Sequence, residues 1–304
     1  MRTARAQSRG ALAALSGVVL LSVLVTGSGR SRAQQERGEP QKRAEPHPKT
    51  ETASKRLEDL RHAAENYRIT LDSEPPRTLV LKPDPVLRWS NPLRRTDDGA
   101  VFIWVSEGRP EVVASFYRHR REEVLQEDHE FQSLATTPLR AARDGSDVWF
   151  PPGGGVSLTP IPDAPPPAAT PAERLRQMRA LAREFKAFFN LPKEQSELRL
   201  LSQPIYRYET HRADVADGAL FAFVQTTDPE VLLLIEARPH AAGLAWHYGI
   251  ARMSMVNLRA EHKERTVWTA DWDDQAEAPN KPYATLPGPR RNVVDDPGES
   301  TGSR

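Results

Sequence analysis

The chain contains 304 residues, of which 38% are hydrophobic and 27 are Pro, and its mean hydropathy is −0.61. This length suits one large domain or two ordinary ones, while the Pro content and the hydropathy indicate that sizeable stretches lie outside any packed core. Because the chain has no Cys, disulfides, thiolate zinc sites and a Cys nucleophile are excluded, and the fold must be stabilised by packing.

Residues 1–33 have the composition of a secretory signal peptide. Three Arg residues precede an uncharged apolar run at 11–25, and Ser31 and Ala33 place small side chains before a cleavage site at Gln34. A run of 15 residues is shorter than the ~20 that span a bilayer comfortably. We therefore predict an exported protein, periplasmic or extracellular, from which this segment is cleaved. A membrane anchor formed by the uncleaved residues 11–25 is the alternative.

The charge balance argues against a nucleic-acid partner. Residues 1–33 hold five Arg and no acidic residue, which leaves 37 basic and 41 acidic residues in the rest of the chain. Nucleic-acid binding needs a clustered Lys/Arg surface, and no basic block is present. Residues 34–51 mix charged residues, Gln and Pro with few apolar side chains, and we expect a disordered tether there.

Two stretches of similar length match each other on either side of a Pro/Gly-rich segment. Residues 98–105 read DGAVFIWV, and 119 positions later residues 217–224 read DGALFAFV. A set with helical spacing opens each stretch: Leu57, Leu60, Ala64, Tyr67 and Leu71 in the first, and Leu175, Met178, Ala182, Phe185 and Phe189 in the second. Several matching blocks in one register predict an internal duplication, and a chance likeness between two β-rich segments is the alternative.

Each stretch is predicted to hold a helix followed by about six strands, and short connections favour antiparallel pairing. We therefore predict an α+β fold of two tandem copies of a helix followed by an antiparallel meander sheet. The predicted segments are a signal peptide at 1–33, a tether at 34–51, a first unit at 52–150, a Pro/Gly-rich linker at 151–169, a second unit at 170–272 and a disordered tail at 273–304.

The central hairpin of each unit is apolar on both faces, which is typical of strands covered on both sides. One amphipathic helix can cover only one face, so we predict that the units pack together about a pseudo-two-fold axis. A sheet that curls around its own helix is the alternative. The repeated Asp-Gly pairs (Asp98, Asp217) and Pro-Glu pairs (Glu111, Glu230) are interpreted as turn residues of these hairpins.

Motifs of known chemistry are absent from the sequence. It contains no HExxH, GxSxG, P-loop or dinucleotide fingerprint. The His residues are scattered without ligand spacing, so we predict neither a metal site nor a cofactor.

Three polar residues of the second unit are candidate catalytic groups. Glu236 ends an apolar strand, where burial raises the pKa of a carboxyl toward general-acid use. Glu209 and His247 lie on two other predicted strands of the same unit, and no spacing rule shows that the three side chains converge. Hydrogen-bonded polar side chains at strand ends are the alternative reading of all three.

Cationic and aromatic residues form a second set of candidates, for ligand binding. Arg88 and Arg207 occupy the same position in the two units, and a structural ion pair or stacking on the next aromatic ring is the alternative role. Tyr208, Trp246 and Tyr248 could form an aromatic platform that stacks sugars or peptides, with packing in the core as the alternative.

Several stretches share their wording with a known group. They are WSNP at 89–92, DGAVFIW at 98–104, GRPEVVASFYR at 108–118, HEFQSL at 129–134 and DGALFAFVQTTDPEVLLLIEAR at 217–238. Over most of the two predicted units the chain resembles exported planctomycete-type proteins of unknown function. The resemblance implies no activity, cofactor or site residue.

The sequence therefore favours a non-enzymatic exported binding or scaffold module, with any ligand site between the two units. A hydrolase or lyase using Glu236, Glu209 and His247 as acid and base is the alternative. A small molecule, a glycan and a protein are all open as partners, and a membrane is a partner only if the N-terminal segment is retained.

Overall fold

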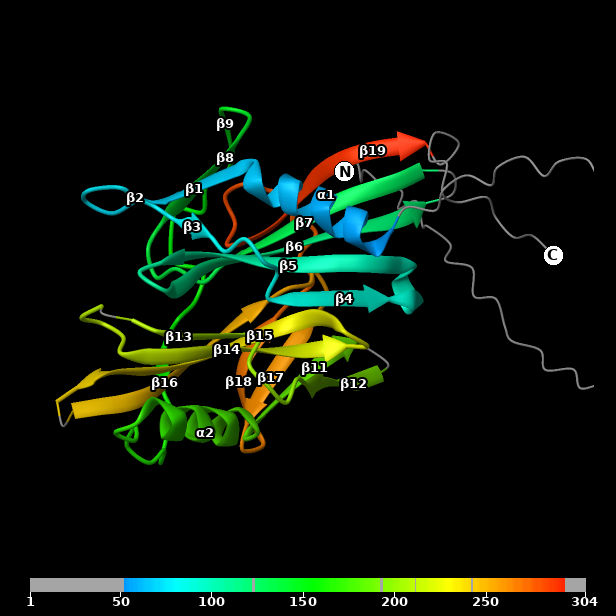
Figure 1. The fold of residues 1–304 in the computed structure, drawn as a ribbon. Helices are drawn as coiled ribbons and strands as arrows, with labels where there is room; N and C mark the ends of the chain where they lie inside the picture. The colour runs from blue at the N-terminus through cyan, green and yellow to red at the C-terminus, as the bar shows by residue number, and fades with distance from the viewer. Residues whose placement is uncertain (1–51, 122–123, 192–193, 211, 242, 293–304) are drawn as a thin grey trace, which may run out of the picture. The chain divides into compact units, whose positions relative to one another are not determined.

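The computed structural model describes residues 52–121, 124–191, 194–210, 212–241 and 243–292 (Figure 1). Within them lie helices α1 (Ala53–Glu65) and α2 (Pro171–Ala182), the short 3-10 helix η1 (Pro92–Arg94) and many antiparallel strands. The fold is therefore α+β and mostly sheet, as predicted. The predicted signal peptide and the predicted tether lie outside the described residues.

The strands are numbered along the chain. The first half (52–150) contains β1 (Tyr67–Leu71), β2 (Arg77–Thr78), β3 (Val80–Leu81), β4 (Leu87–Asn91), β5 (Thr96–Ser106), β6 (Arg109–Arg121), β7 (Val124–Ser133), β8 (Leu139–Arg143) and β9 (Ser146–Trp149). The second half (151–272) contains β10 (Thr159–Pro160), β11 (Phe185–Leu191), β12 (Glu194–Leu200), β13 (Tyr206–Glu209), β14 (Asp217–Gln225), β15 (Asp228–His240), β16 (Gly243–Arg252), β17 (Leu258–His262) and β18 (Arg265–Ala270), and β19 (Tyr283–Asn292) follows it.

The described strands form three sheets. The first half contributes a small sheet of order β2-β1-β8-β9 and most of a larger one of order β19-β7-β6-β5-β3, in which β4 also pairs with β5. The second half forms one sheet of order β10-β16-β15-β14-β12-β11-β17-β18, in which β13 also pairs with β14. Each half thus has a long meander at its centre, β5-β6-β7 in the first and β14-β15-β16 in the second.

Both helices are capped by Thr and are shorter than the apolar spacing predicts. Thr52 accepts a hydrogen bond from the Lys55 backbone N–H at 3.2 Å, and Thr170 accepts one from Glu173 at 3.3 Å. The predicted stripes continued into residues 67–71 and 185–189, but the structure begins β1 and β11 there. The prediction failed because the run is too short to separate two apolar repeats. Phe185 and Phe189 fit a helical spacing, but Phe185, Ala187 and Phe189 equally fit the two-residue spacing of a strand.

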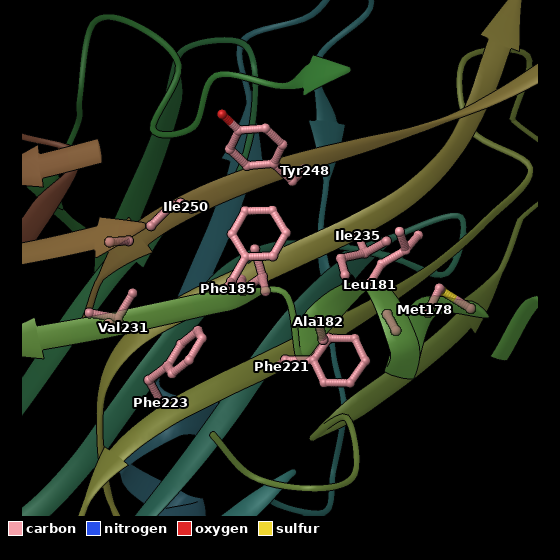
Figure 2. Close-up of a cluster of buried hydrophobic side chains, with 14 of the residues drawn as sticks. Met178, Leu181, Ala182, Phe185, Phe221, Phe223, Val231, Ile235, Tyr248 and Ile250 are labelled. Carbon is pink, nitrogen blue, oxygen red and sulfur yellow. The ribbon is translucent and has the colours of Figure 1, made fainter. Parts of the chain in front are cut away.

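The meanders are buried on both faces, as predicted. One face of β14 and β15 packs with α2 and β11 in a core that includes Met178, Leu181, Phe185, Phe221 and Tyr248 (Figure 2). A matching core joins Leu60 and Ala64 of α1 to Phe102, Phe116 and Phe131. The opposite faces meet in a third core, which contains Val101, Ile103 and Val113 from the first half and Leu220, Leu232 and Leu234 from the second.

Two predicted segments are corrected by the structure. The linker at 151–169 is not free chain, because Val156 and Ile161 are buried in two different cores and β10 pairs with β16. The predicted disordered tail at 273–304 contains β19, which pairs with β7 of the first half. Residues 293–304 lie outside the described residues.

Candidate functional site

The three candidate catalytic residues do not all lie on one face of the sheet. In the strand register Tyr208, Gly218, Glu236 and His247 lie in one row across β13 to β16, and Glu209, Asp217, Ala237 and Trp246 lie in the next row. Neighbouring rows point to opposite faces of a sheet. Glu236 and His247 therefore share a face, while Glu209 points to the other one, where its side chain is 57% exposed.

Glu236 lies at the centre of a buried ion cluster between the two halves. We call this the Arg109 cluster; its members are Arg109, Glu111, Tyr208, Arg212, Asp214, Glu236 and Arg238. Arg109, which is 1% exposed, donates from Nε to Glu236 at 2.7 Å and from Nη1 to Glu111 at 2.6 Å. Arg238 donates to the second oxygen of Glu236 at 2.6 Å, and the Tyr208 hydroxyl donates to the first at 2.6 Å.

The charges of the Arg109 cluster balance. Three guanidinium groups face the carboxylates of Glu111, Asp214 and Glu236. Burial alone would lower the pKa of Arg109, but Glu236 and Glu111 hold it above its usual value. Burial raises the pKa of Glu111 even though Arg109 and Arg212 oppose the shift. With each carboxylate already paired to guanidinium groups, this cluster has the character of a structural joint between the halves.

Arg88 and Arg207 are partners of structural carboxylates. Arg88 contacts Asp98 at 2.5 Å, and Arg207 contacts Asp217 in the same way. A helix residue joins each pair, Arg56 on Asp98 and Arg174 on Asp217. The two Asp side chains therefore tie each helix to its sheet, which bears out the ion-pair alternative for both Arg residues.

The Asp-Gly and Pro-Glu pairs were wrongly interpreted as turn residues. Gly99 and Gly218 lie inside β5 and β14, and a Cβ would lie 2.2 Å from the Trp89 ring at Gly99 and 2.4 Å from the Tyr208 ring at Gly218. Glycine is needed for this close approach rather than for a turn. Glu111 and Glu230 lie on β6 and β15, where they are 2% and 0% exposed and paired with Arg residues.

The predicted aromatic platform does not form on one surface. Trp246 and Tyr248 are buried in the core that contains α2, in agreement with the packing alternative. Tyr208 lies in the row of Glu236, which faces the other half.

A cavity of about 180 Å³ lies between the halves, and none of the residues predicted as catalytic or ligand-binding lines it. We call it the Asp228 cavity; it is lined by Trp89, Arg94, Thr96, Tyr117, His119, Glu130 and Asp228. Trp89 and Tyr117 form its aromatic wall, with ring centroids 5.3 Å apart. The single lining residue from the second half is Asp228, which accepts a hydrogen bond from Asn91 at 3.0 Å.

Carboxylates outnumber cations around this cavity. Burial raises the pKa of Asp228 to about 6, against the opposing effects of Asn91 and Arg94. Burial together with the nearby Asp228 raises the pKa of Glu230 and of Glu130 to about 8. Arg94 reaches Glu230 at 3.0 Å and Asp228 at 3.5 Å from a side chain that is 42% exposed. Such shifted carboxyl groups around a hollow are typical of functional sites.

The sequence contained one usable signal for this site. At the offset of 119, Arg109-Pro110-Glu111 of the first half aligns with Asp228-Pro229-Glu230 of the second. The aligned triplets differ only by the exchange of a cation for an anion, and the structure places them in the Arg109 cluster and beside the Asp228 cavity.

The described residues contain no group of three or more His, Asp or Glu side chains placed to hold a metal ion. In the same residues we find no helix with the length and apolar character to cross a membrane. No family model matches the chain, and no curated protein or solved structure matches it. The resemblance to exported planctomycete-type proteins thus stays a prediction.

Proposed function

We propose that the two halves arose by duplication and pack about a pseudo-two-fold axis. Reciprocal contacts support this arrangement. At one hairpin tip the backbone oxygen of Gly108 accepts a hydrogen bond from the Tyr206 hydroxyl at 3.1 Å. At the equivalent tip the Thr227 hydroxyl oxygen accepts one from the Ser90 backbone N–H at 2.9 Å. Ser90 aligns with Glu209, whose backbone oxygen would lie 3.1 Å from a Cβ at Gly108. Contacts that recur with their partners exchanged are expected of a two-fold relation.

We propose further that this exported chain is a non-enzymatic binding module whose ligand site is the Asp228 cavity. The observation that carries the proposal is a hollow between the halves with one aromatic wall and a lining that includes Glu130 and Asp228. Aromatic side chains with polar groups that converge on a hollow are features of small-ligand sites, and here most of the lining is polar or charged, which favours a polar ligand. Its volume of about 180 Å³ suits a small molecule or a single side chain of a partner.

The acid–base alternative has less support from the geometry. Glu209 lies on the opposite face from Glu236 and His247, and the Glu236 carboxylate is already occupied by Arg109, Arg238 and Tyr208. A carboxylate held in this way has no lone pair directed at a substrate, which a general base needs.

The binding proposal is tested by filling the cavity. A panel of cationic, neutral and anionic small compounds is screened by NMR line broadening against the wild-type chain and the Thr96→Phe variant, whose ring would occupy the hollow. Thr269→Phe, on the exposed face of β18, is the matched control. We expect hits that bind the wild type and the control but not Thr96→Phe. Hits that all bind Thr96→Phe equally well, or no hits at all, would contradict the proposal.

A further inference from the structure

We propose that the ligand of the Asp228 cavity carries a guanidinium group at the end of a short alkyl chain. The inference rests on the binding function proposed above and adds the chemistry of the ligand. It depends on a comparison between the cavity and the Arg109 cluster, which occupies the equivalent position on the other side of the interface.

The two positions are equivalent in strand register. Trp89, Gly99 and Tyr117 form a row across β4, β5 and β6, and Tyr208, Gly218 and Glu236 form the same row across β13, β14 and β15. Each row faces the start of the long strand of the other half. The row of Glu236 faces Arg109, which donates a hydrogen bond to Glu236. The row of Tyr117 faces Asp228, and Tyr117 and Asp228 line the same cavity.

The Arg109 cluster shows which group this kind of site holds. There a guanidinium lies between the carboxylates of Glu111 and Glu236, near the Tyr208 ring, with 1% of the Arg109 side chain exposed. The Asp228 cavity offers aromatic rings and carboxylates again, and the guanidinium of Arg94 lines it, at 3.0 Å from Glu230 and 3.5 Å from Asp228. Arg94 is one guanidinium beside three carboxyl groups, those of Asp228, Glu130 and Glu230, whereas the charges of the Arg109 cluster balance.

The charges around the cavity would favour such a group. Glu130 and Asp228 line it, Glu230 pairs with the lining residue Arg94 at 3.0 Å, and Asp128 contacts the lining residue His119 at 3.4 Å. The nearby cations are Arg94 and Arg252. The Arg252 guanidinium lies over the Tyr283 ring, 5.1 Å from the ring centroid. Next to Asp228, the fully buried Asn91 has a side-chain oxygen without a hydrogen-bond partner among the described residues.

A planar guanidinium matches these walls better than an ammonium ion does. It presents N–H donors in a fork that suits carboxylates, and its flat face stacks on aromatic rings. Trp89 and Tyr117 supply the rings, and Glu130 and Asp228 supply the acceptors.

The test compares three probes of similar size by isothermal titration at pH 7.5: n-propylguanidinium, the uncharged n-propylurea and the anion butyrate. We expect the wild-type chain to bind n-propylguanidinium at least tenfold more tightly than either other probe. Asp228→Asn should weaken that binding about tenfold or more, since a charge-assisted hydrogen bond is lost. Asp147→Asn, which changes an exposed ion pair with Arg140, should leave it unchanged.

A second readout separates binding from a change in folding. Because Asp228 and Glu130 must be ionised to accept the probe, its affinity should rise between pH 5.5 and pH 8.5, and this rise should be smaller in Asp228→Asn. Propylurea or butyrate binding as tightly as n-propylguanidinium in the wild type, and lost in Thr96→Phe, would overturn the guanidinium inference and leave the binding function standing. Failure of every probe and of the wider panel would overturn both.

Discussion

The Arg109 cluster and the Asp228 cavity occupy equivalent places in the interface between the halves, yet one is filled and the other is hollow. In the first, three guanidinium groups meet three carboxylates around Arg109, which is 1% exposed. In the second, Asp228 stands where the first has Arg109 and lies 3.5 Å from Arg94, and a cavity of about 180 Å³ lies beside it. The comparison teaches that the change from a structural joint to a candidate site goes with the exchange of Arg109 for Asp228 and of Glu236 for Tyr117 at aligned positions of the two halves.

The largest effect is expected from breaking the filled cluster. Replacing Arg109 with Met leaves Glu236 and Glu111 buried with fewer partners, so the free energy of unfolding should fall by about 3 to 5 kcal/mol. Urea denaturation followed by tryptophan fluorescence measures it. Arg140→Met, in an exposed ion pair, is the control and should leave the free energy of unfolding close to the wild-type value. A loss below ~1 kcal/mol for Arg109→Met would show that the cluster does not hold the halves together.

The paired glycines provide a finer comparison of packing. An added methyl group at Gly218 would strike the Tyr208 ring, which is held by Glu236, whereas one at Gly99 would strike the Trp89 ring, which borders the cavity. Gly218→Ala should therefore destabilise by about 1 to 3 kcal/mol, and Gly99→Ala by less because the Trp89 ring, although its Nε1 donates to Ser115 at 2.9 Å, borders the cavity. Equal losses of unfolding free energy for the two variants in urea denaturation would mean that the cavity beside Trp89 does not relieve the clash.

A smaller effect is expected from pH at the hollow position. The folded-state pKa of Glu130 is about 8, above the ordinary value near ~4.3 in an unfolded chain. The folded state binds the extra proton, so this contribution to stability is complete below pH ~4.3 and is lost as the pH rises through about 8. Unfolding free energies measured from pH 5 to pH 9 should fall less steeply in Glu130→Gln than in the wild type. Glu197→Gln, at an exposed position of β12, should keep the wild-type dependence of the unfolding free energy on pH.

The smallest effect is expected at the rim of the filled cluster. Burial tends to raise the pKa of Asp214, but hydrogen bonds and charges from Arg212 and Arg238 lower it to about 2. Its contribution is therefore present above the unfolded value of ~3.9 and is lost as the pH falls through about 2. Because Asp214 is 45% exposed, Asp214→Asn should cost at most ~1 kcal/mol at pH 7. Thermal unfolding at pH 7 and pH 2.5 should show the difference between variant and wild type shrinking in acid.

The meanders and the helix starts could be predicted from the sequence, whereas the segments joining them could not. The apolar runs of the meanders are local signals, and they were interpreted correctly; the Thr residues that cap the two helices are local signals of the same kind. The strand β19 was predicted to be disordered because residues 273–304 mix charged residues and Pro with few apolar side chains. It lies at the edge of its sheet, where Pro287 and Pro289 are tolerated, and its register shifts at this point. Its pairing with β7 is a long-range contact that no local pattern reports.

The candidate site could be predicted only in its location. A ligand position between the halves follows from hairpins that are apolar on both faces, but none of the residues named for it lines the Asp228 cavity. Glu236 and Tyr208 belong to the filled cluster, Trp246 and Tyr248 to a core, and the two Arg residues to ion pairs with Asp98 and Asp217. Arg109 and Glu236 are 127 positions apart, and no spacing rule joins residues so distant. The exchange of Arg109 for Asp228 was visible in the aligned halves, although its meaning depends on which carboxylates the fold brings nearby.

The strand β19 has a consequence for how this chain acquires its structure during synthesis. Translation proceeds from the amino terminus, so the outer edge of β7 is made long before its partner at Tyr283–Asn292 leaves the ribosome. Until then the first half exposes a row of unpaired backbone groups that would attract strands of other nascent chains. A truncation before Tyr283 would keep that edge permanently open, so shortened chains should accumulate as aggregates even when every residue of both meanders is present.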